Sequence, residues 1–183
     1  MTRRRALAAA VAAPVTARAA SAAAAGLTGD AAVLQPIHRD EMFALAAYRA
    51  AAVSPSARVR EIAVRFRRHE AQHVAALATA LEALGAPRFA PPGGAAGLDR
   101  EAQRLGIAPL FSELRTPDEL LGFLLAVEER LIADWVKAHA GLGEPNLVQT
   151  ATQVLACQGE HVTVLRHALG RDPLPAAFEA GSA

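Results

Sequence analysis

The sequence predicts an all-α protein, a four-helix bundle in which a long crossover joins the second helix to the third. Hydrophobic residues make up 52% of the 183 residues and aromatic residues only 4%. Alanine, a strong helix former, supplies much of the apolar content. The alternation of β-branched and aromatic residues that is typical of strands is missing. Proline and glycine divide the chain after residue 29 into four long helical segments.

The first two helices are predicted at about residues 30–52 and 56–84. Ser54-Pro55 ends the first, because the residue before a proline disfavours helical geometry. Gly85-Ala-Pro87 is a helix stop and ends the second. Pro36 lies near the start of the first helix, where proline is tolerated or kinks the chain.

Roughly 30 residues separate the second helix from the third, including Pro91-Pro-Gly-Gly94. A loop of this length in a compact domain needs a structural reason. We expect a short crossing helix at residues 99–105. Two helical hairpins joined by one long crossover form a recognised type of four-helix bundle.

The third helix is predicted at about residues 117–140 and the fourth at about 146–170. Thr116-Pro-Asp-Glu119 is a strong start signal, with a capping threonine, proline at the first helical position and glutamate three residues after the cap. The glycine-rich stretch Gly141-Leu-Gly-Glu-Pro145 separates the two helices, and Gly170 ends the fourth.

The chain divides into residues 1–28 and a bundle at residues 29–181. The net charge of +1 hides an asymmetry, because four of the 19 basic residues lie in residues 1–25, which contain no acidic residue. The remaining 15 basic and 18 acidic residues give a mildly acidic body, which argues against a nucleic-acid partner. No segment reaches the roughly 20 apolar residues that a membrane-spanning helix needs.

Residues 1–28 have the layout of an export signal. Thr2-Arg-Arg-Arg5 precedes an apolar run that ends near Val15, and small residues follow at 17–24 as cleavage options. Consecutive arginines after threonine resemble twin-arginine signals. We expect export to the periplasm, the cell envelope or the extracellular space. Pro14 and Arg18 interrupt the run, so a disordered tail rich in alanine and arginine is the alternative.

A carboxylate and an imidazole are paired on the second helix, and the pattern returns on the fourth. Glu70-Ala-Gln-His73 is echoed by Gln158-Gly-Glu-His161. Residues three apart share a helix face, so each pair points in one direction. The second copy has Gln158 where the first has Glu70.

Two further glutamates lie on apolar faces. Glu128 has leucine or isoleucine three and four residues away on both sides, and Glu41 has Ile37, Ala44 and Leu45 around it. Burial of an unpaired charge costs several kcal/mol, so these groups should be protonated, paired or bound to a cation. One glutamate from each of two helices and Glu-x-x-His from the others is the di-metal carboxylate pattern. Carboxylates and imidazoles favour iron or manganese, with zinc as a competitor.

These positions resemble the ferritin-like family, specifically exported bacterial ferritin-like domain proteins with twin-arginine-type leaders. The resemblance covers about residues 29–181 and implies a ferritin-like bundle. It implies metal-ligand roles for Glu41, Glu70, His73, Glu128 and His161, with Gln158 replacing a bridging or terminal glutamate. The segments that show it best are Glu41-Met-Phe-Ala-Leu-Ala-Ala-Tyr48, Glu70-Ala-Gln-His73-Val-Ala-Ala-Leu77, Ala126-Val-Glu128-Glu-Arg130 and His161-Val-Thr-Val-Leu-Arg-His-Ala-Leu-Gly170.

Gln158 leaves the function open. Glutamine offers a neutral carbonyl oxygen but no charge, so we expect weaker metal binding at one of two positions, or a single occupied position. If the site is active, the implied chemistry is oxidation of Fe(II) by oxygen or peroxide, or manganese-dependent peroxide consumption. The alternative is a metal-free bundle that acts as a structural or binding module in the cell envelope. Monomer and homo-oligomer are both compatible with the sequence.

Four neighbouring groups complete the sequence-based expectations. Tyr48 and Trp135 each follow a glutamate by seven residues and are interpreted as core packing rather than as redox relays. His38 and His69 are candidates for groups that support the ligands. Cys157 lies four residues before His161, so the two can bind a soft metal, although a small buried cysteine is the more ordinary interpretation.

Overall fold

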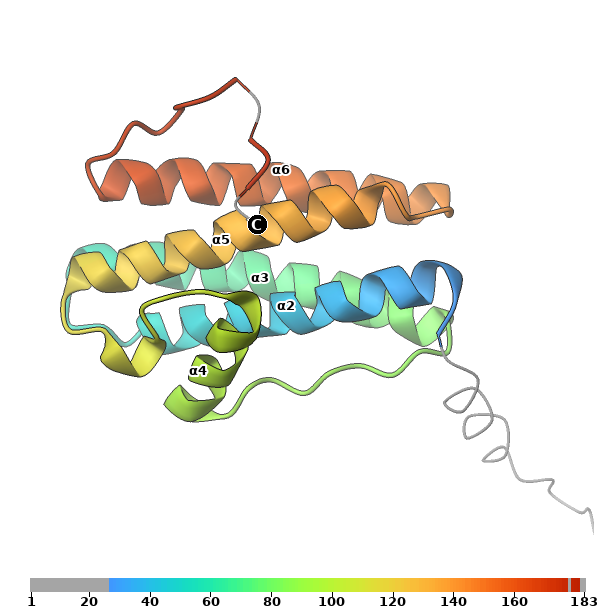
Figure 1. Cartoon of the computed structure of the whole chain (residues 1–183), viewed down its shortest axis with the longest axis horizontal. Helices are drawn as coiled ribbons and strands as arrows, with labels where there is room; N and C mark the ends of the chain where they lie inside the picture. Colours follow the sequence, from blue (N-terminus) through green and yellow to red (C-terminus); the bar gives the residue numbers. More distant parts are fainter. Residues whose placement is uncertain (1–26, 178, 182–183) are drawn as a thin grey trace, which may run out of the picture.

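The computed structural model describes residues 27–177 and 179–181. All regular secondary structure in these residues is helical, and they contain no strand. Four long helices form the bundle: α2 (Gly29–Ala51), α3 (Ala57–Ala83), α5 (Pro117–His139) and α6 (Pro145–Ala168) (Figure 1). The crossover between α3 and α5 contains α4 (Gly94–Leu105) and the 3-10 turn η1 (Phe111–Glu113). The predicted all-α bundle with a long crossover is confirmed. All but the last two residues of the predicted export signal lie outside the described residues.

The helices begin where the sequence places capping groups. The Ser56 hydroxyl accepts a hydrogen bond from the backbone N–H of Val59 at the start of α3. At the start of α5, Thr116 and Glu119 form a reciprocal capping box before Pro117. Such caps satisfy backbone donors that have no partner within the helix. They mark the first residues of α3 and of α5.

The crossover helix differs from its predicted extent. α4 begins at Gly94 rather than near residue 99, directly after the two prolines. Its apolar face includes Leu98, Ala102 and Leu105, all buried against the outside of α2 and the crossover. Glycine at 94 and 97 lowers the local helix propensity, so no clear start for this helix is visible in the sequence. The buried side chain of Leu98 supports the helix through tertiary packing.

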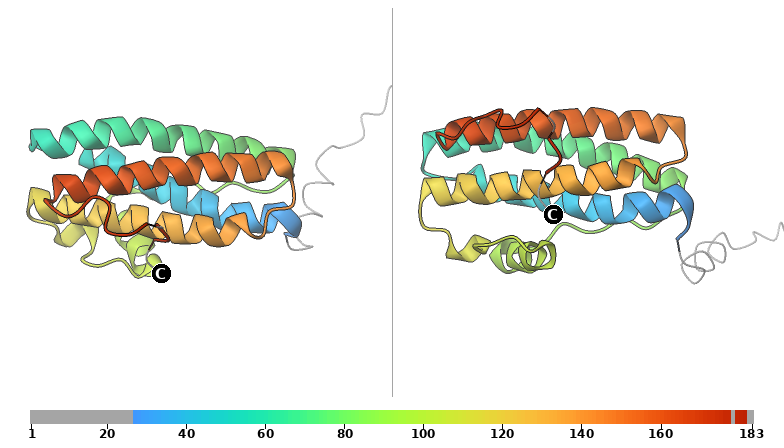
Figure 2. Two further views of the ribbon diagram at one scale, coloured as in Figure 1. Left: turned by 90° about the horizontal axis from the view of Figure 1, so that it is seen from above. Right: turned by 45° about the horizontal axis from the view of Figure 1, so that its top comes forward.

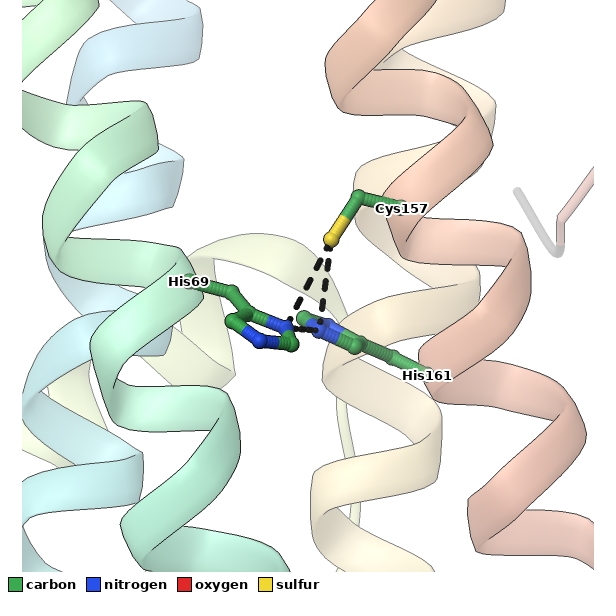
Figure 3. Close-up of side chains that lie close together, drawn as sticks. All are labelled: His69, Cys157 and His161. Atoms are coloured by element: carbon green, nitrogen blue, oxygen red, sulfur yellow. Dashed lines mark hydrogen bonds between the residues drawn. The ribbon is translucent and has the colours of Figure 1, made fainter.

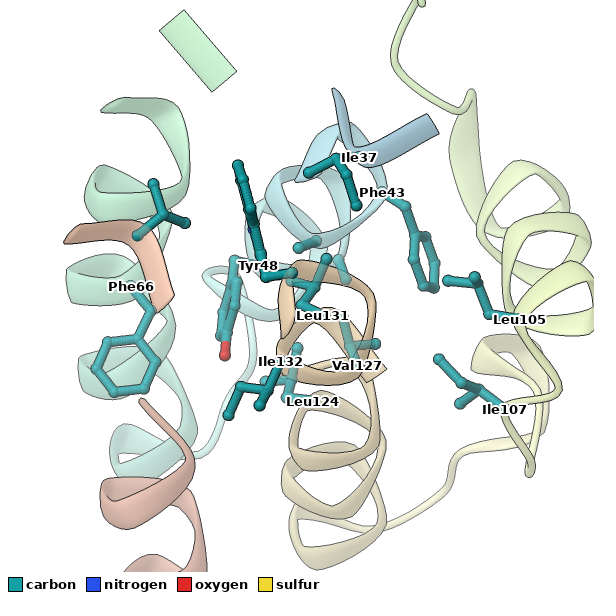
Figure 4. Close-up of a cluster of buried hydrophobic side chains, with 14 of the residues drawn as sticks. Ile37, Phe43, Tyr48, Phe66, Leu105, Ile107, Leu124, Val127, Leu131 and Ile132 are labelled. Carbon is teal, nitrogen blue, oxygen red and sulfur yellow. The ribbon is translucent and has the colours of Figure 1, made fainter. Parts of the chain in front are cut away.

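The two hairpins pack side by side. α2 lies chiefly against α3, α5 lies against α6, and α2 and α5 join the two pairs (Figures 1 and 2). Apolar side chains fill the interior, among them Tyr48, Phe66 and Leu131, while Phe43 packs toward the crossover near Leu105 (Figure 4). Eight polar or charged side chains among the described residues are buried as well, and six of them belong to the predicted site.

After α6 the chain turns back along the bundle (Figure 2), and Gly181 lies against α5. Arg166 in α6 holds this return by pairing with Glu179 and with Glu129 of α5. Gly181 has a φ of +71°, and a β-carbon there would collide with the backbone of Glu129. Glycine is therefore required for this close approach. Among the described residues, no helix is long and apolar enough to cross a membrane.

Candidate metal centre

The six predicted site residues meet in the interior of the bundle, and all four long helices contribute. Each is at most 8% exposed. They are Glu41 from α2, Glu70 and His73 from α3, Glu128 from α5, and Gln158 and His161 from α6. Glu160, one residue from His161, is exposed to solvent, as its rotation around the helix predicts. The structure thus brings together every residue of the predicted set.

Five of these residues form two overlapping groups. In the first, one potential ligand atom from each of Glu41, Glu70 and His73 lies within 4.8 Å of the others. In the second, the same holds for Glu70, Glu128 and His161. Glu70 belongs to both groups, which is the position of a bridging carboxylate in a di-metal centre.

The two histidines present the same nitrogen to the carboxylates. His73 Nδ1 lies 3.4 Å from Glu41 Oε2 and 3.6 Å from Glu70 Oε2. His161 Nδ1 lies 3.3 Å from Glu70 Oε1 and 3.1 Å from Glu128 Oε1. The repeated motif in the sequence therefore corresponds to a repeated arrangement around Glu70.

Two aromatic side chains hold the carboxylates of Glu41 and Glu128, each from the opposite hairpin. The Tyr48 hydroxyl of α2 donates a hydrogen bond of 2.5 Å to Glu128 Oε1 of α5. Trp135 Nε1 of α5 donates one of 2.6 Å to Glu41 Oε1 of α2. Both rings are buried, as core packing predicts, but their polar atoms also orient the candidate ligands. The sequence signal was the shared seven-residue spacing, together with the rule that a buried Tyr O–H or Trp N–H needs a partner.

Gln158 occupies the place that corresponds to Glu70 in the other half. Its amide Nε2 donates a hydrogen bond of 3.1 Å to Glu41 Oε1, while its carbonyl Oε1 is buried without a partner. Glutamine thus satisfies Glu41 with a donor that glutamate lacks. The exchange removes one negative charge from the centre.

Burial and mutual repulsion control the protonation of the cluster. Burial, together with the nearby carboxylates of Glu41 and Glu128, raises the pKa of Glu70 to about 8. Burial alone would also raise the pKa of Glu41, but the attraction of His73 and the Trp135 hydrogen bond hold that pKa below its usual value. Burial disfavours charged imidazoles, yet the carboxylates and Cys157 raise the pKa of His73 and of His161 to about 12. Protons therefore balance the negative charge when no cation is present.

The polar atoms of the cluster are under-satisfied. Among the described residues, the buried side-chain nitrogen and oxygen atoms without a hydrogen-bond partner are all in this cluster: Glu41 Oε2, Glu70 Oε1 and Oε2, His73 Nδ1, Glu128 Oε2 and Gln158 Oε1. Buried polar atoms normally have partners, and each one left without costs about 1–3 kcal/mol. Coordination of metal ions would pair these atoms, so the residues present fit such ions.

The two other predicted histidines have different surroundings. His69 Nδ1 lies 2.9 Å from His161 Nε2, next to a predicted ligand. The backbone N–H of Phe89 donates to His38 Nδ1, which ties α2 to the crossover.

The carboxylate clusters, the buried histidines and the four helices together define a centre suited to cations.

Comparison with known proteins identifies one matching family model. Residues 29–171 match the model of the ferritin-like domain, which spans most of the chain. No curated protein sequence and no solved structure shows significant similarity to the chain.

Proposed function

Because the chain belongs to the ferritin-like domain family, we propose that its bundle binds a pair of redox-active metal ions, iron or manganese, at a centre weakened by Gln158. The observation that supports this proposal most strongly is that the unpartnered buried polar atoms of the described residues all belong to the six site residues. Folded proteins rarely bury polar atoms without partners, because the lost hydration is costly unless a cation or a proton offsets it.

Each of the two overlapping groups would hold one ion. Glu41 and His73 would bind the first, Glu128 and His161 the second, and Glu70 would bind both. Three carboxylates neutralise three of the four charges of two divalent ions. The carbonyl oxygen of Gln158 can bind a metal but leaves the fourth charge unbalanced. We therefore expect one position to bind more weakly than the other.

Bound iron would supply one-electron chemistry, the oxidation of Fe(II) by oxygen or peroxide. The residues of the chain have other tasks. Tyr48 and Trp135 fix the orientation of Glu128 and Glu41, and the apolar core excludes bulk water. Preorganised ligands in a dry site bind a cation without further reorganisation.

We further propose that this activity takes place after export. Support comes from the basic and then apolar layout of residues 1–28. A metal-free structural or binding module is the competing function. The hydrogen bond from Gln158 to Glu41 favours it, because that bond satisfies a carboxylate without any ion.

Metal content and thermal stability together test the proposal. The native protein, Gln158→Glu and Gln103→Glu are purified without chelators, and bound iron and manganese are counted. Gln103 is exposed on α4, so its substitution adds the same charge away from the centre. We expect less than two ions per chain in the native protein, more in Gln158→Glu, and no change in Gln103→Glu.

The stability measurement separates the two functions. Without metal, Gln158→Glu should melt below the native protein, because a carboxylate replaces the amide that donates to Glu41. Added Mn²⁺ should restore and exceed the native melting temperature, since ligand binding stabilises the folded state. Absence of metal from both forms, with no thermal shift on addition of Mn²⁺ or Fe²⁺, would refute the proposal and favour the metal-free module.

A further inference from the structure

A second set of donor atoms lies on the other side of His161. His161 directs Nδ1 toward the carboxylates, and its Nε2 faces outward to His69 and Cys157 (Figure 3). His161 Nε2 lies 2.9 Å from His69 Nδ1 and 3.5 Å from Cys157 Sγ. Cys157 Sγ lies 3.7 Å from His69 Nδ1. Two helices, α3 and α6, therefore place two imidazoles and one thiol around a single point.

We propose that His69, Cys157 and His161 form a binding site for one zinc ion, which lies outside the carboxylate centre and shares only His161 with it. Zinc takes nitrogen at about 2.0–2.1 Å and sulfur at about 2.3 Å in tetrahedral geometry. Donor atoms at those lengths lie about 3.5 Å apart for N and S and about 3.3 Å apart for two N atoms. The two N–S distances already match, and the two nitrogens need to separate by only a few tenths of an ångström.

The ring of His161 is held in place for this role. Phe66 stacks on it with ring centroids 3.9 Å apart, and the His69 ring is nearly parallel to it at an interplanar angle of 14°. His161 Nδ1 faces Glu128 Oε1, which also accepts the hydrogen bond of Tyr48. A metal-bound histidine typically donates its second N–H to a carboxylate, which fixes its tautomer and its orientation. His161 thus has a ready partner for binding zinc through Nε2.

Solvent provides access and a fourth ligand. His69 and Cys157 line a surface pocket of about 320 Å³ between α3 and α6, beside Gln72, Gln153 and His73 of the inner centre. Both side chains are partly exposed, whereas the carboxylates are fully buried. An ion can therefore reach the site without opening the core, and water can complete the tetrahedron.

The two sites compete for His161. A neutral imidazole has one free lone pair, so zinc on Nε2 leaves the proton on Nδ1, pointing at Glu128. Nδ1 is then unable to bind a metal in the carboxylate centre. Zinc in the outer site should weaken the second inner position and leave the first, formed by Glu41, Glu70 and His73, in place.

Cobalt provides the test, because Co²⁺ substitutes for zinc and a bound thiolate gives a charge-transfer absorption in the near ultraviolet. The reduced, metal-free full chain is titrated with Co²⁺ and then with Zn²⁺. We expect this band to saturate at one cobalt per chain and to disappear as zinc displaces it. Cys157→Ser should abolish the band, and His69→Asn should weaken binding at least tenfold.

Two control variants separate this site from other ligands. His139→Asn changes a partly buried histidine on α5 and should keep the band. Glu41→Gln impairs only the inner centre and should keep it as well. Circular dichroism checks that each variant is folded. The proposal of an outer site would be overturned if the native protein gave no band, or if His69→Asn bound Co²⁺ with unchanged affinity.

Competition tests the shared histidine and distinguishes the two proposals. One equivalent of Zn²⁺ should lower the amount of Mn²⁺ bound by the native protein but not by Cys157→Ser. Equal loss in both proteins would contradict the outer site, because zinc would then be acting at the carboxylates. Binding of manganese by Cys157→Ser would support the proposed function independently of the outer site.

Discussion

At the scale of single residues, the candidate centre depends on hydrogen bonds that cross between the hairpins. Tyr48 belongs to the first hairpin and holds Glu128 of the second, while Trp135 of the second holds Glu41 of the first. Neither carboxylate is oriented by its own hairpin alone. Each short bond also offsets part of the cost of burying a carboxylate in an apolar core.

Loss of the Tyr48 hydroxyl should destabilise the protein without disturbing its packing. Tyr48→Phe keeps the ring against Phe66 and removes only the donor to Glu128. We expect the free energy of unfolding of the metal-free protein to fall by about 1–3 kcal/mol, because the buried Glu128 Oε1 loses its shorter hydrogen bond and keeps only the contact with His161 Nδ1. Urea unfolding measures the change. Trp135→Phe removes the equivalent bond to Glu41 and also part of a buried ring, so it should cost at least as much. An unchanged midpoint in both variants would contradict this account.

The sequence predicts which residues enter the core better than it predicts their partners. Glu41 and Glu128 are found from their own helices, because apolar neighbours three and four residues away identify a buried face. The partners of Tyr48 and Trp135, and His69 as a partner of Cys157, lie on other helices. Finding them requires the relative rotation and shift of packed helices, which one helix does not encode.

At the scale of the elements, local signals define the four long helices well. Ser56, Thr116 and the breaks at Gly85 and Pro145 place the ends of the bundle helices within a few residues of the structure. α4 is the exception, because no capping side chain marks its start and its buried residues begin only at Gly97. Ion pairs add to that burial: Glu101 of α4 accepts hydrogen bonds from Arg39 of α2 and from Arg104.

The attachment of α4 to α2 should weaken in acid. Burial opposes the charge of Glu101, but the hydrogen bonds from Arg39 and Arg104 outweigh it and lower its pKa. A carboxyl group with a lowered folded pKa stabilises the protein above its unfolded value of about 4.3, and that contribution is lost as the pH falls through the folded value. Arg104 also pairs with Asp40, so one partner remains after substitution.

Glu101→Gln should therefore reduce the free energy of unfolding by about 0.5–1 kcal/mol at pH 7. The difference from the native protein should shrink as the pH falls below about 4. Denaturant unfolding across this pH range measures both effects. Glu82→Gln is the matched control, because the Glu82–Arg88 pair is 4.0 Å apart and more than half exposed on both sides. A constant difference at every pH would contradict the assignment to Glu101.

At the scale of the whole molecule, the centre joins two halves of similar design. Each hairpin contributes one glutamate from its first helix and a motif ending in histidine from its second. The duplicated pattern was readable from the sequence, and the helical periods predicted that all four helices would meet. What the sequence left undecided is how the charges balance, because this depends on the distances around Glu70.

Metal bound in this centre should stabilise all four bundle helices together. When both positions are filled, the first ion has ligands from α2 and α3 and the second from α3, α5 and α6, so opening any one of these helices releases at least one ion. A position exposed to Mn²⁺ at one hundred times its dissociation constant adds about 2.7 kcal/mol to folding. Amide hydrogen exchange should slow throughout α2, α3, α5 and α6 and change less in α4, which contributes no ligand. Glu70→Gln removes the carboxylate that both groups share and should abolish the effect. Slowing confined to α3 and α6 would instead locate the ion at the outer site, because His69 lies on α3 and Cys157 and His161 lie on α6.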